Sequence, residues 1–368
     1  MVLPRIPYTS PFPAPTIHPS HAVTLPAAIR ELTAFLTSAG TGKTLLLSGA
    51  GISVASGLSD YRGEAGTYRL NRSYRPIFFH EFTSRHAARQ RYWARSFLGF
   101  PLTAEARPNA AHAAAKKLWE MGVLGAVVTQ NVDSLHGFGD GMEVVELHGT
   151  LRDVVCLSCH HKVSREEFQR MLAALNPLWR QLLLDDAAVM RKVKTNPDGD
   201  VDMPGVEYSR FRYPPCPLCL RRHPELRVDR DGAFLEQKTG DVTGVLKPCV
   251  TFFGENVASA VKARAEALVE EAAAVLVVGS SLATYSAWRL VRGAARREKG
   301  LGIVNLGGVR GEAEFFGPDA QGARIRLEVP AAEVLKGVVG ELRGRIAAPV
   351  EHEMQAELRN GLSTGLAG

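Results

Sequence analysis

Short apolar runs alternate with amphipathic stretches along most of the chain. The run at 43–48 (KTLLLS) is continuous and apolar, as expected for a strand buried on both faces of a parallel sheet. Similar runs lie at 124–129, 142–147, 274–279, 302–306 and 324–329. Helical periodicity occurs at 28–39, 110–120 and 257–272. This alternation predicts an α/β fold in which helices cover both faces of a parallel sheet.

Three segments depart from this pattern. Residues 151–245 carry two C-x-x-C pairs, many charges and a polar stretch at 195–205, which predicts a small separate module. Residues 1–26 hold seven prolines and a single Arg, Asp, Glu or Lys side chain, Arg5, so we expect a disordered leader. Its Ser and Thr content and lack of acidic residues also suit a cleaved transit peptide. The polar, Gly-rich residues 346–368 predict a flexible tail.

Composition limits the function classes. With 368 residues, the chain is long enough for about two or three domains. Its 45% hydrophobic and 22% charged residues, without an apolar run near 20 residues, exclude a disordered, fibrous or membrane-embedded chain. The net charge of +6 and pI near 9.1 suit nucleic acid, an anionic cofactor or a matrix-like compartment, and equally a solvated basic surface without a ligand.

Four of the five cysteines form two C-x-x-C pairs, which predict a zinc site at Cys156, Cys159, Cys216 and Cys219. Four thiolate ligands leave no open position for water, so this zinc would be structural. The alternative is four unrelated buried cysteines. Cys249 stands apart, as a buried or loop thiol.

A glycine turn, Gly-Ala-Gly-Ile-Ser at 49–53, follows the first strand directly. Such a turn lets backbone approach a pyrophosphate, and the next helix would aim its N–H groups at the anion. Val54 replaces the third glycine of the dinucleotide fingerprint, so an ordinary tight turn remains an alternative. The stretch 42–44 resembles the end of a P-loop but runs into a strand, which argues against a nucleoside triphosphatase.

Polar residues stand at several other strand ends. Residues 130–133 follow the second apolar run, His148 follows the third, and residues 279–281 follow the fourth. The carboxyl ends of parallel strands line one crevice, so these residues should converge with 49–53 on a single cleft.

The motifs, in chain order, are Gly-Ala-Gly-Ile-Ser at 49–53, Asp-Tyr-Arg-Gly at 60–63, Thr-Gln-Asn-Val-Asp-Ser-Leu-His at 129–136, Leu-His-Gly at 147–149, the C-x-x-C pairs, Lys-Pro-Cys-Val-Thr-Phe-Phe-Gly-Glu at 247–255, Val-Gly-Ser-Ser-Leu at 278–282 and Asn-Leu-Gly at 305–307. Taken together, they resemble those of the sirtuin family. The segments Arg-Gln-Arg-Tyr-Trp-Ala-Arg at 89–95 and Val-Gly-Ser-Ser-Leu-Ala-Thr-Tyr-Ser at 278–286 are similar to its class II branch. The resemblance runs in order from about residue 27 to about 340.

The resemblance implies an NAD-binding Rossmann-like domain over 27–150 and 246–345, with a helical insertion over 64–105, and a zinc-binding module over 151–245. It implies that three groups of residues hold NAD: those of the pyrophosphate turn, those of the mobile cofactor loop and the nicotinamide pocket, and those at the adenosine end. These are Gly49, Ala50 and Gly51; Asp60, Tyr61, Arg62, Gln130, Asn131, Val132 and Asp133; and Gly279, Ser280, Ser281, Asn305 and Gly307. Residues 253–255 would pair with the backbone of an acylated-lysine substrate.

The implied reaction is NAD-dependent removal of an acyl group from protein lysine, giving nicotinamide, free lysine and O-acyl-ADP-ribose. His148 would be the general base that takes a proton from a ribose hydroxyl, since imidazole titrates near neutral pH. The sequence departs from the family at Ser59, where proline is usual, and at Cys249, where aspartate is usual. A cysteine common near the adenine is also replaced, around 323–325.

Several questions stay open. The succinyl-selective branch of the family carries a Tyr-x-x-Arg pair, but here Asn71 stands three residues after Tyr68, which disfavours strict desuccinylation. Acetyl, long-chain, branched and lipoyl groups all remain as possible substrates. Mono-ADP-ribosyl transfer is an alternative with the same NAD site. A zinc-bearing chromatin-binding module, using the basic stretch 292–299, is a non-enzymatic one. We expect acylated protein substrates, no membrane partner, no direct nucleic-acid binding, and location in the mitochondrial matrix, with nucleus or cytoplasm as alternatives.

Overall fold

The computed structural model describes residues 12–71, 74–137, 141–185, 196–201 and 206–345. All six predicted strands lie in one parallel sheet, in the order β3-β2-β1-β7-β8-β9. They span β1 Thr44–Ser48, β2 Leu124–Thr129, β3 Glu143–Glu146, β7 Ala274–Val278, β8 Gly300–Val304 and β9 Arg324–Leu327. The strand order reverses at β1, so the carboxyl ends of β1, β2 and β7 open a crevice suited to a ligand.

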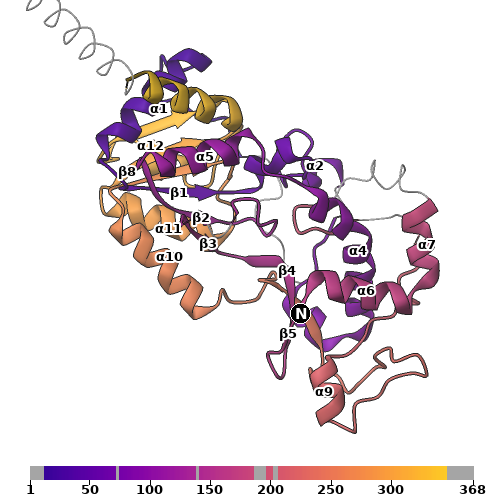
Figure 1. The fold of residues 1–368 in the computed structure, drawn as a ribbon. Helices are drawn as coiled ribbons and strands as arrows, with labels where there is room; N and C mark the ends of the chain where they lie inside the picture. The colour runs from indigo at the N-terminus through magenta and orange to yellow at the C-terminus, as the bar shows by residue number, and fades with distance from the viewer. Residues whose placement is uncertain (1–11, 72–73, 138–140, 186–195, 202–205, 346–368) are drawn as a thin grey trace, which may run out of the picture.

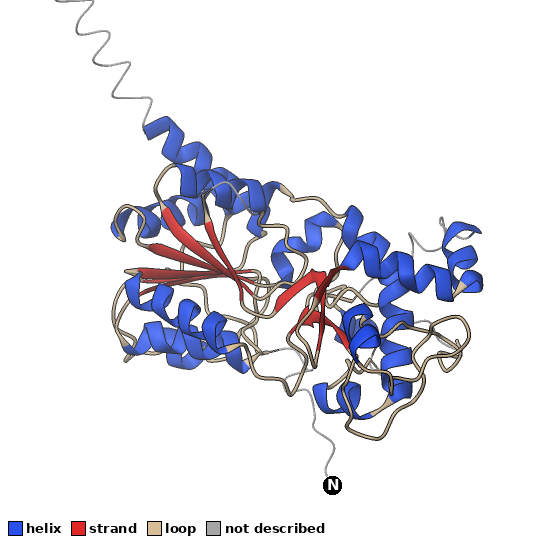
Figure 2. Ribbon diagram, turned by 60° about the horizontal axis from the view of Figure 1, so that its bottom comes forward, coloured by secondary structure: helices blue, strands red, loops and turns tan. Residues whose placement is uncertain are grey.

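Helices cover both faces of this sheet, as predicted (Figures 1 and 2). On one face, α1 (Leu25–Ser38), α5 (Ala110–Glu120) and the helical residues 331–345 share a core with Leu46. On the other, α10 (Ser259–Glu271), α11 (Tyr285–Arg296) and α12 (Glu312–Phe316) pack against Leu45 and Leu47. Successive side chains of β1 thus enter opposite cores, which explains why its run is apolar throughout.

A second unit is built on a three-stranded antiparallel sheet in the order β5-β4-β6. Its strands are β4 Gly149–Cys156, β5 Lys162–Ser164 and β6 Leu246–Val250, so residues 246–250 belong to this sheet although the sequence division starts the α/β domain at 246. Its helices are α2 Thr67–Leu70, α3 Phe79–Ser84, α4 His86–Glu105, α6 Arg165–Leu175, α7 Pro177–Asp185 and α9 Pro217–Arg222. Trp93 and Phe97 of α4 share one core with Phe168 and Phe211, so the predicted insertion packs with this unit (Figure 1).

The N-terminal segment corrects one expectation. The described part of the predicted disordered leader is ordered from His18 onward: its backbone pairs with that of Arg326 in β9, and Ala22 is buried. The last leader residues already start α1, which Thr24 caps and which carries Pro26 in its first turn. Proline is tolerated there because first-turn N–H groups have no partner within the helix. Residues 1–11 and the predicted tail, 346–368, lie outside the described residues.

No helix among the described residues has both the length and the apolar character needed to cross a membrane.

Candidate active site

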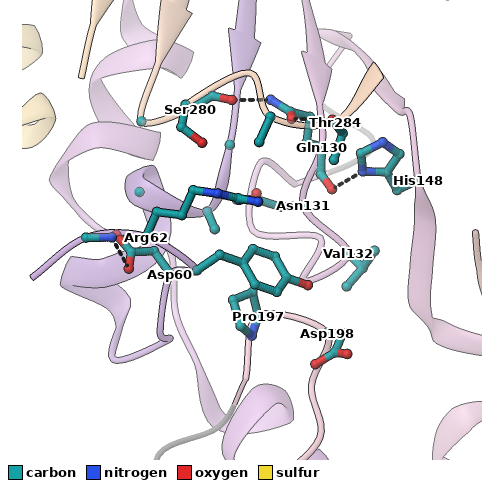
Figure 3. A pocket seen from close by; sticks show the side chains of 18 of the residues that line it. Asp60, Arg62, Gln130, Asn131, Val132, His148, Pro197, Asp198, Ser280 and Thr284 are labelled. Carbon is teal, nitrogen blue, oxygen red and sulfur yellow. Dashed lines mark hydrogen bonds between the residues drawn. The ribbon is translucent and has the colours of Figure 1, made fainter. Parts of the chain in front are cut away.

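A cavity of about 1630 Å³ opens at the carboxyl ends of β1, β2 and β7 and reaches the second unit (Figure 3). Pockets for one small ligand usually measure about 300–1,000 Å³, so this volume suits more than one substrate. With one exception, the residues predicted to bind NAD or to act in catalysis all line it: Gly49, Ala50, Gly51, Asp60, Tyr61, Arg62, Gln130, Asn131, Val132, His148, Gly279, Ser280, Ser281, Asn305 and Gly307. The strand-end argument therefore located the cleft.

The glycine turn packs closely against the loop after β7. The backbone N–H of Gly51 donates to the carbonyl of Gly279, 2.9 Å away, and a Cβ on Gly51 would lie 2.9 Å from the Cα of Gly279. Gly279 itself has φ +63°, a conformation that favours glycine. Residues 50–56 form a 3₁₀ helix, η1 (Ala50–Ser56), where the sequence predicted an ordinary helix. Gly51 and Gly279 therefore allow the glycine turn and the loop after β7 to pack directly against each other.

Gln130 is fixed by three polar contacts at the centre of the cavity. Its side-chain amide donates to Ser280 Oγ at 2.7 Å and to the carbonyl of Ser48 at 3.2 Å, and its Oε1 accepts from Thr284 Oγ1 at 3.2 Å. Figure 3 shows the first of these bonds crossing from the end of β2 to the loop after β7. This network holds the Gln130 side chain and its backbone in place.

Asp133 is the exception among the predicted NAD-binding residues, because it does not line the large cavity. Its carboxylate accepts hydrogen bonds from Ser53 Oγ at 2.7 Å and from the backbone N–H of Leu135 at 3.0 Å. Ser53 in turn accepts from the Asn131 amide at 3.1 Å. Asp133 therefore supports Asn131 from behind through Ser53.

Both ring nitrogens of His148 have partners. Nδ1 lies 2.9 Å from the backbone carbonyl of Gln130, and Nε2 lies 2.7 Å from Ser286 Oγ. A carbonyl can only accept, so Nδ1 carries the hydrogen and Nε2 the lone pair. Burial lowers the pKa of His148 below its ordinary value near 6.5, and the bond to Gln130 offsets part of that effect. His148 is therefore neutral at physiological pH, with Nε2 as its basic atom.

The predicted cofactor loop folds over the other side of the cavity. Asp60 accepts from the backbone N–H of Gly63 at 3.0 Å, and burial raises the pKa of Asp60 despite that bond and the nearby Arg62. The Arg62 guanidinium lies 5.1 Å from the centre of the Tyr68 ring, and its side chain extends across the pocket toward Asn131 (Figure 3). Arg62 is thus a cation within the cavity.

Some lining residues had no signal in the sequence. Pro197 and Asp198 come from the segment predicted as zinc module, yet they face the cavity (Figure 3). Asp198 accepts from the Tyr74 hydroxyl at 2.7 Å, and burial together with Asp200 raises the pKa of Asp198 to about 8. Phe12 of the N-terminal segment also lines the cavity. Neither segment follows a strand of the parallel sheet, so no pattern pointed to them.

The loop after β6 forms the wall nearest His148. The backbone N–H of Thr251 donates to the carbonyl of His148 at 2.8 Å, and the N–H of Phe79 donates to the carbonyl of Phe253 at 2.9 Å. Glu255 accepts from the N–H of Phe252 at 2.8 Å and pairs with Lys247. The predicted peptide-binding segment, 253–255, is therefore bonded to α3 through Phe253, and it begins two residues after Thr251, which is bonded to the His148 backbone.

The four predicted zinc ligands come together within the second unit. Their Sγ atoms lie within 4.8 Å of one another, with 3.6 Å between Cys156 and Cys219 and 3.7 Å between Cys159 and Cys216. Zn–S bonds of about 2.3 Å in a tetrahedron require sulfurs about 3.8 Å apart. All four cysteines are free of disulfides. The donor set and its spacing fit a structural zinc ion.

A family model described as the Sir2 family matches residues 49–286, which is more than half of the chain. This chain belongs to the Sir2 family, the sirtuins. The match spans the glycine turn, the Gln130 network, His148, the four cysteines and Ser286. The family assignment made from the motifs is therefore confirmed.

Relatives agree over most of the chain. An NAD-dependent protein deacylase of Batrachochytrium dendrobatidis is 39% identical over 308 residues, 82% of this chain and 90% of the relative. An NAD-dependent protein deacetylase of Bordetella bronchiseptica is 38% identical over 300 residues, 82% and 94% of the two chains. A Sir2 enzyme solved for its mechanism and regulation is similar with 26% identity and a TM-score of 0.54, covering 86% of this chain and 97% of its own. A Sir2 complex with p53 peptide and NAD⁺, at 24% identity, TM-score 0.55 and 85% and 98% coverage, shares the fold.

Proposed function

We propose that this sirtuin is an NAD-dependent protein-lysine deacylase in which His148 is the general base. The observation that carries the proposal is the state of His148: neutral, Nδ1 tied to the Gln130 carbonyl, and Nε2 basic within the cavity that the NAD-binding motifs line. Relatives named as NAD-dependent deacylases and deacetylases support the reaction class.

The residues present fit an anionic dinucleotide. The cavity combines a glycine turn that brings backbone close to its floor, the Arg62 guanidinium, and polar side chains at the ends of β1, β2 and β7. We assign the pyrophosphate to the turn at 49–51, the nicotinamide ribose to Gln130 and Asn131, and the adenosine to Ser280, Asn305 and Gly307. When bound, NAD supplies the ribose carbon that receives the acyl oxygen and the nicotinamide that leaves.

His148 accepts one proton at Nε2 from a substrate hydroxyl. The resulting imidazolium holds its other hydrogen against the Gln130 carbonyl, so the ring gains charge without turning. The half-buried site limits water around this nitrogen, and the cofactor loop covers the cavity from the opposite side. Enclosure of this kind protects reactive groups from premature hydrolysis.

The acylated peptide enters along residues 253–255, whose backbone is already placed beside His148 and α3. A bound peptide strand there would bring its acyl-lysine to the same cavity. Arg69 lines this cavity, while Tyr68 is buried and stacks on Tyr61 at 5.4 Å. The zinc serves the fold of the second unit rather than the reaction.

The non-enzymatic alternative loses its main support. In the stretch 292–299, Arg292 pairs with Glu314 and Arg297 with Glu270, and Lys299 donates to the carbonyls of Glu270 and Ala272. These basic groups are engaged within the protein, so they do not form a free cationic patch. Mono-ADP-ribosyl transfer uses the same NAD site and remains the enzymatic alternative.

A panel of acyl peptides with NAD tests the proposal by mass spectrometry. Deacylation yields O-acyl-ADP-ribose and free lysine for acetyl, long-chain, branched or lipoyl peptides, and the relative rates identify the preferred acyl group. A protein that carries ADP-ribose, with every peptide left intact, would instead identify a transferase. Location in the mitochondrial matrix is a further proposal, which fusion of residues 1–30 to a fluorescent reporter tests.

A further inference from the structure

Ser286 contacts the atom of His148 that the proposed reaction uses. Its Oγ lies 2.7 Å from Nε2, and both side chains line the cavity. Nδ1 already carries the imidazole hydrogen, so the Ser286 hydroxyl donates to the lone pair of Nε2. The resemblance to the family assigns no role to Ser286, which lies four residues after the Gly-Ser-Ser-Leu sequence.

The position of Ser286 is set by a helix start. Thr284 is the N-cap of α11, and Ser286 is the second residue of its first turn. The partial positive charge of a helix N-terminus favours neutral over charged imidazole, which is the same direction in which burial shifts the pKa of His148. Because Ala287 and Leu290 of α11 are buried in the core against the parallel sheet, the start of the helix is held in a fixed position.

The same short segment holds both nitrogens of the imidazole. Ser280 and Thr284 bind the Gln130 side chain, and the Gln130 carbonyl binds Nδ1. Ser286 binds Nε2 directly. Residues 280–286, which connect β7 to α11, therefore fix the ring from two sides.

We propose that Ser286 is the positioning residue of the general base: before substrate binds, its hydroxyl holds the His148 ring so that Nε2 already faces the place that the substrate hydroxyl will take. This inference rests on the proposed function of His148. When the substrate hydroxyl arrives, Ser286 yields its place at Nε2. The substrate O–H bond then breaks, an N–H bond forms at Nε2, and the electron pair of the broken bond stays on the substrate oxygen.

Three variants separate positioning from a merely structural role. Ser286→Ala removes the hydroxyl, Ser286→Thr keeps it, and Arg296→Ala alters an exposed residue at the far end of the same helix. We expect kcat for deacylation to fall between about 10- and 100-fold in Ser286→Ala, the effect of a misplaced reacting group. Exchange of labelled nicotinamide into NAD should persist, because nicotinamide leaves before the base acts. Ser286→Thr should restore most of kcat, and Arg296→Ala should match wild type.

A second readout needs neither NAD nor activity. The nitrogen NMR shift of His148 Nε2, assigned by its loss in His148→Ala, should move in ligand-free Ser286→Ala toward the value of an imidazole lone pair without a donor. Ser286→Thr should leave it near wild type. An unchanged shift in Ser286→Ala, or unchanged kcat in a folded variant, would overturn the proposal. If the wild-type protein removes no acyl group, the proposed function fails, while the NMR comparison still decides whether Ser286 holds the ring.

Discussion

The ammonium group of Lys247 lies 3.0 Å from the carboxylate of Glu255, and only 4% and 22% of their side chains are exposed. Lys247 also donates to the carbonyls of Pro248 and Val250, and Glu255 accepts from the N–H of Phe252. The pair thus closes the loop that follows β6. Burial lowers the pKa of Lys247, and Glu255 counteracts that shift.

Lys247→Met should therefore loosen the loop after β6, which we propose binds the peptide. Loss of the ammonium removes one donor from Glu255, which keeps the Phe252 N–H, and one from each of two carbonyls; a buried polar group that loses its partner costs about 1–3 kcal/mol. We expect KM for the acyl peptide to rise several-fold more than KM for NAD, with a lower Tm. Arg264→Met is the matched control, because it removes exposed ion pairs with Glu143 and Glu271. Exposed pairs contribute about 0–1 kcal/mol, so equal effects of the two variants would contradict this role for Lys247.

Acid should destabilise the protein through His136. This side chain is buried, its Nε2 lies 2.8 Å from Ser48 Oγ, and burial together with the nearby His112 lowers the pKa of His136 to about 3. The unfolded chain takes up a proton near pH 6.5 and the folded one does not. The contribution of His136 to the free energy of unfolding is therefore fully present above pH 6.5. It falls by about 1.4 kcal/mol per pH unit between pH 6.5 and about pH 3.

Denaturant unfolding of wild type and His136→Gln between pH 7 and pH 5 measures this slope. The variant should lose stability less steeply with falling pH, even if it is less stable at pH 7. Parallel slopes for wild type and His136→Gln would show that His136 does not contribute.

Zinc should be required for the second unit to fold. Cys156, Cys216 and Cys219 are fully buried in its core, so their substitution removes the ion and leaves thiolates among apolar side chains. We expect one zinc per chain by elemental analysis, and for Cys156→Ser no bound zinc and no cooperative unfolding of this unit. Cys249→Ser should keep its zinc. Full zinc content in Cys156→Ser would contradict the four-cysteine site.

Gly308→Ala should release the N-terminal segment from the cavity. A Cβ at Gly308 would lie 1.9 Å from the carbonyl oxygen of Pro13, so one of the two must move. The side chain of the buried Arg326 donates to the carbonyls of Asn305 and Gly307, and its backbone pairs with the backbone of His18. These bonds fix the chain on both sides of the contact between Gly308 and Pro13. We expect faster hydrogen exchange across residues 12–22. Gly340→Ala, where a Cβ has open space, should leave exchange there unchanged.

Strands of the parallel sheet could be predicted because each is buried on both faces and reads as a continuous apolar run, as in β7 with Val275, Leu276 and Val277. The polar residues that follow these strands then predicted the location of the site, because the carboxyl ends of parallel strands lie at one edge of the sheet. β6 escaped prediction, since Lys247, Pro248 and Cys249 interrupt its apolar pattern. Pro248 is compatible with a strand here because β6 lies at the edge of its sheet.

Contacts between distant segments could not be predicted. Asp198 reaches the cavity from a polar stretch whose spacing matches no motif, and the pairing of His18 with Arg326 joins residues at opposite ends of the chain. The proline content of the leader did not predict that its described part would pair through His18 with β9, the strand at the edge of the parallel sheet. Asp133 illustrates the reverse case, because a motif residue supports its neighbours rather than facing the cavity.

The most direct test concerns His148. In His148→Ala, NAD binding measured by calorimetry and exchange of labelled nicotinamide should persist, because the cavity and its glycine turn are intact. Formation of O-acyl-ADP-ribose should fall by about 100- to 10,000-fold, the usual contribution of a general base. Deacylation by His148→Ala at the wild-type rate would contradict the assignment of His148 as the base.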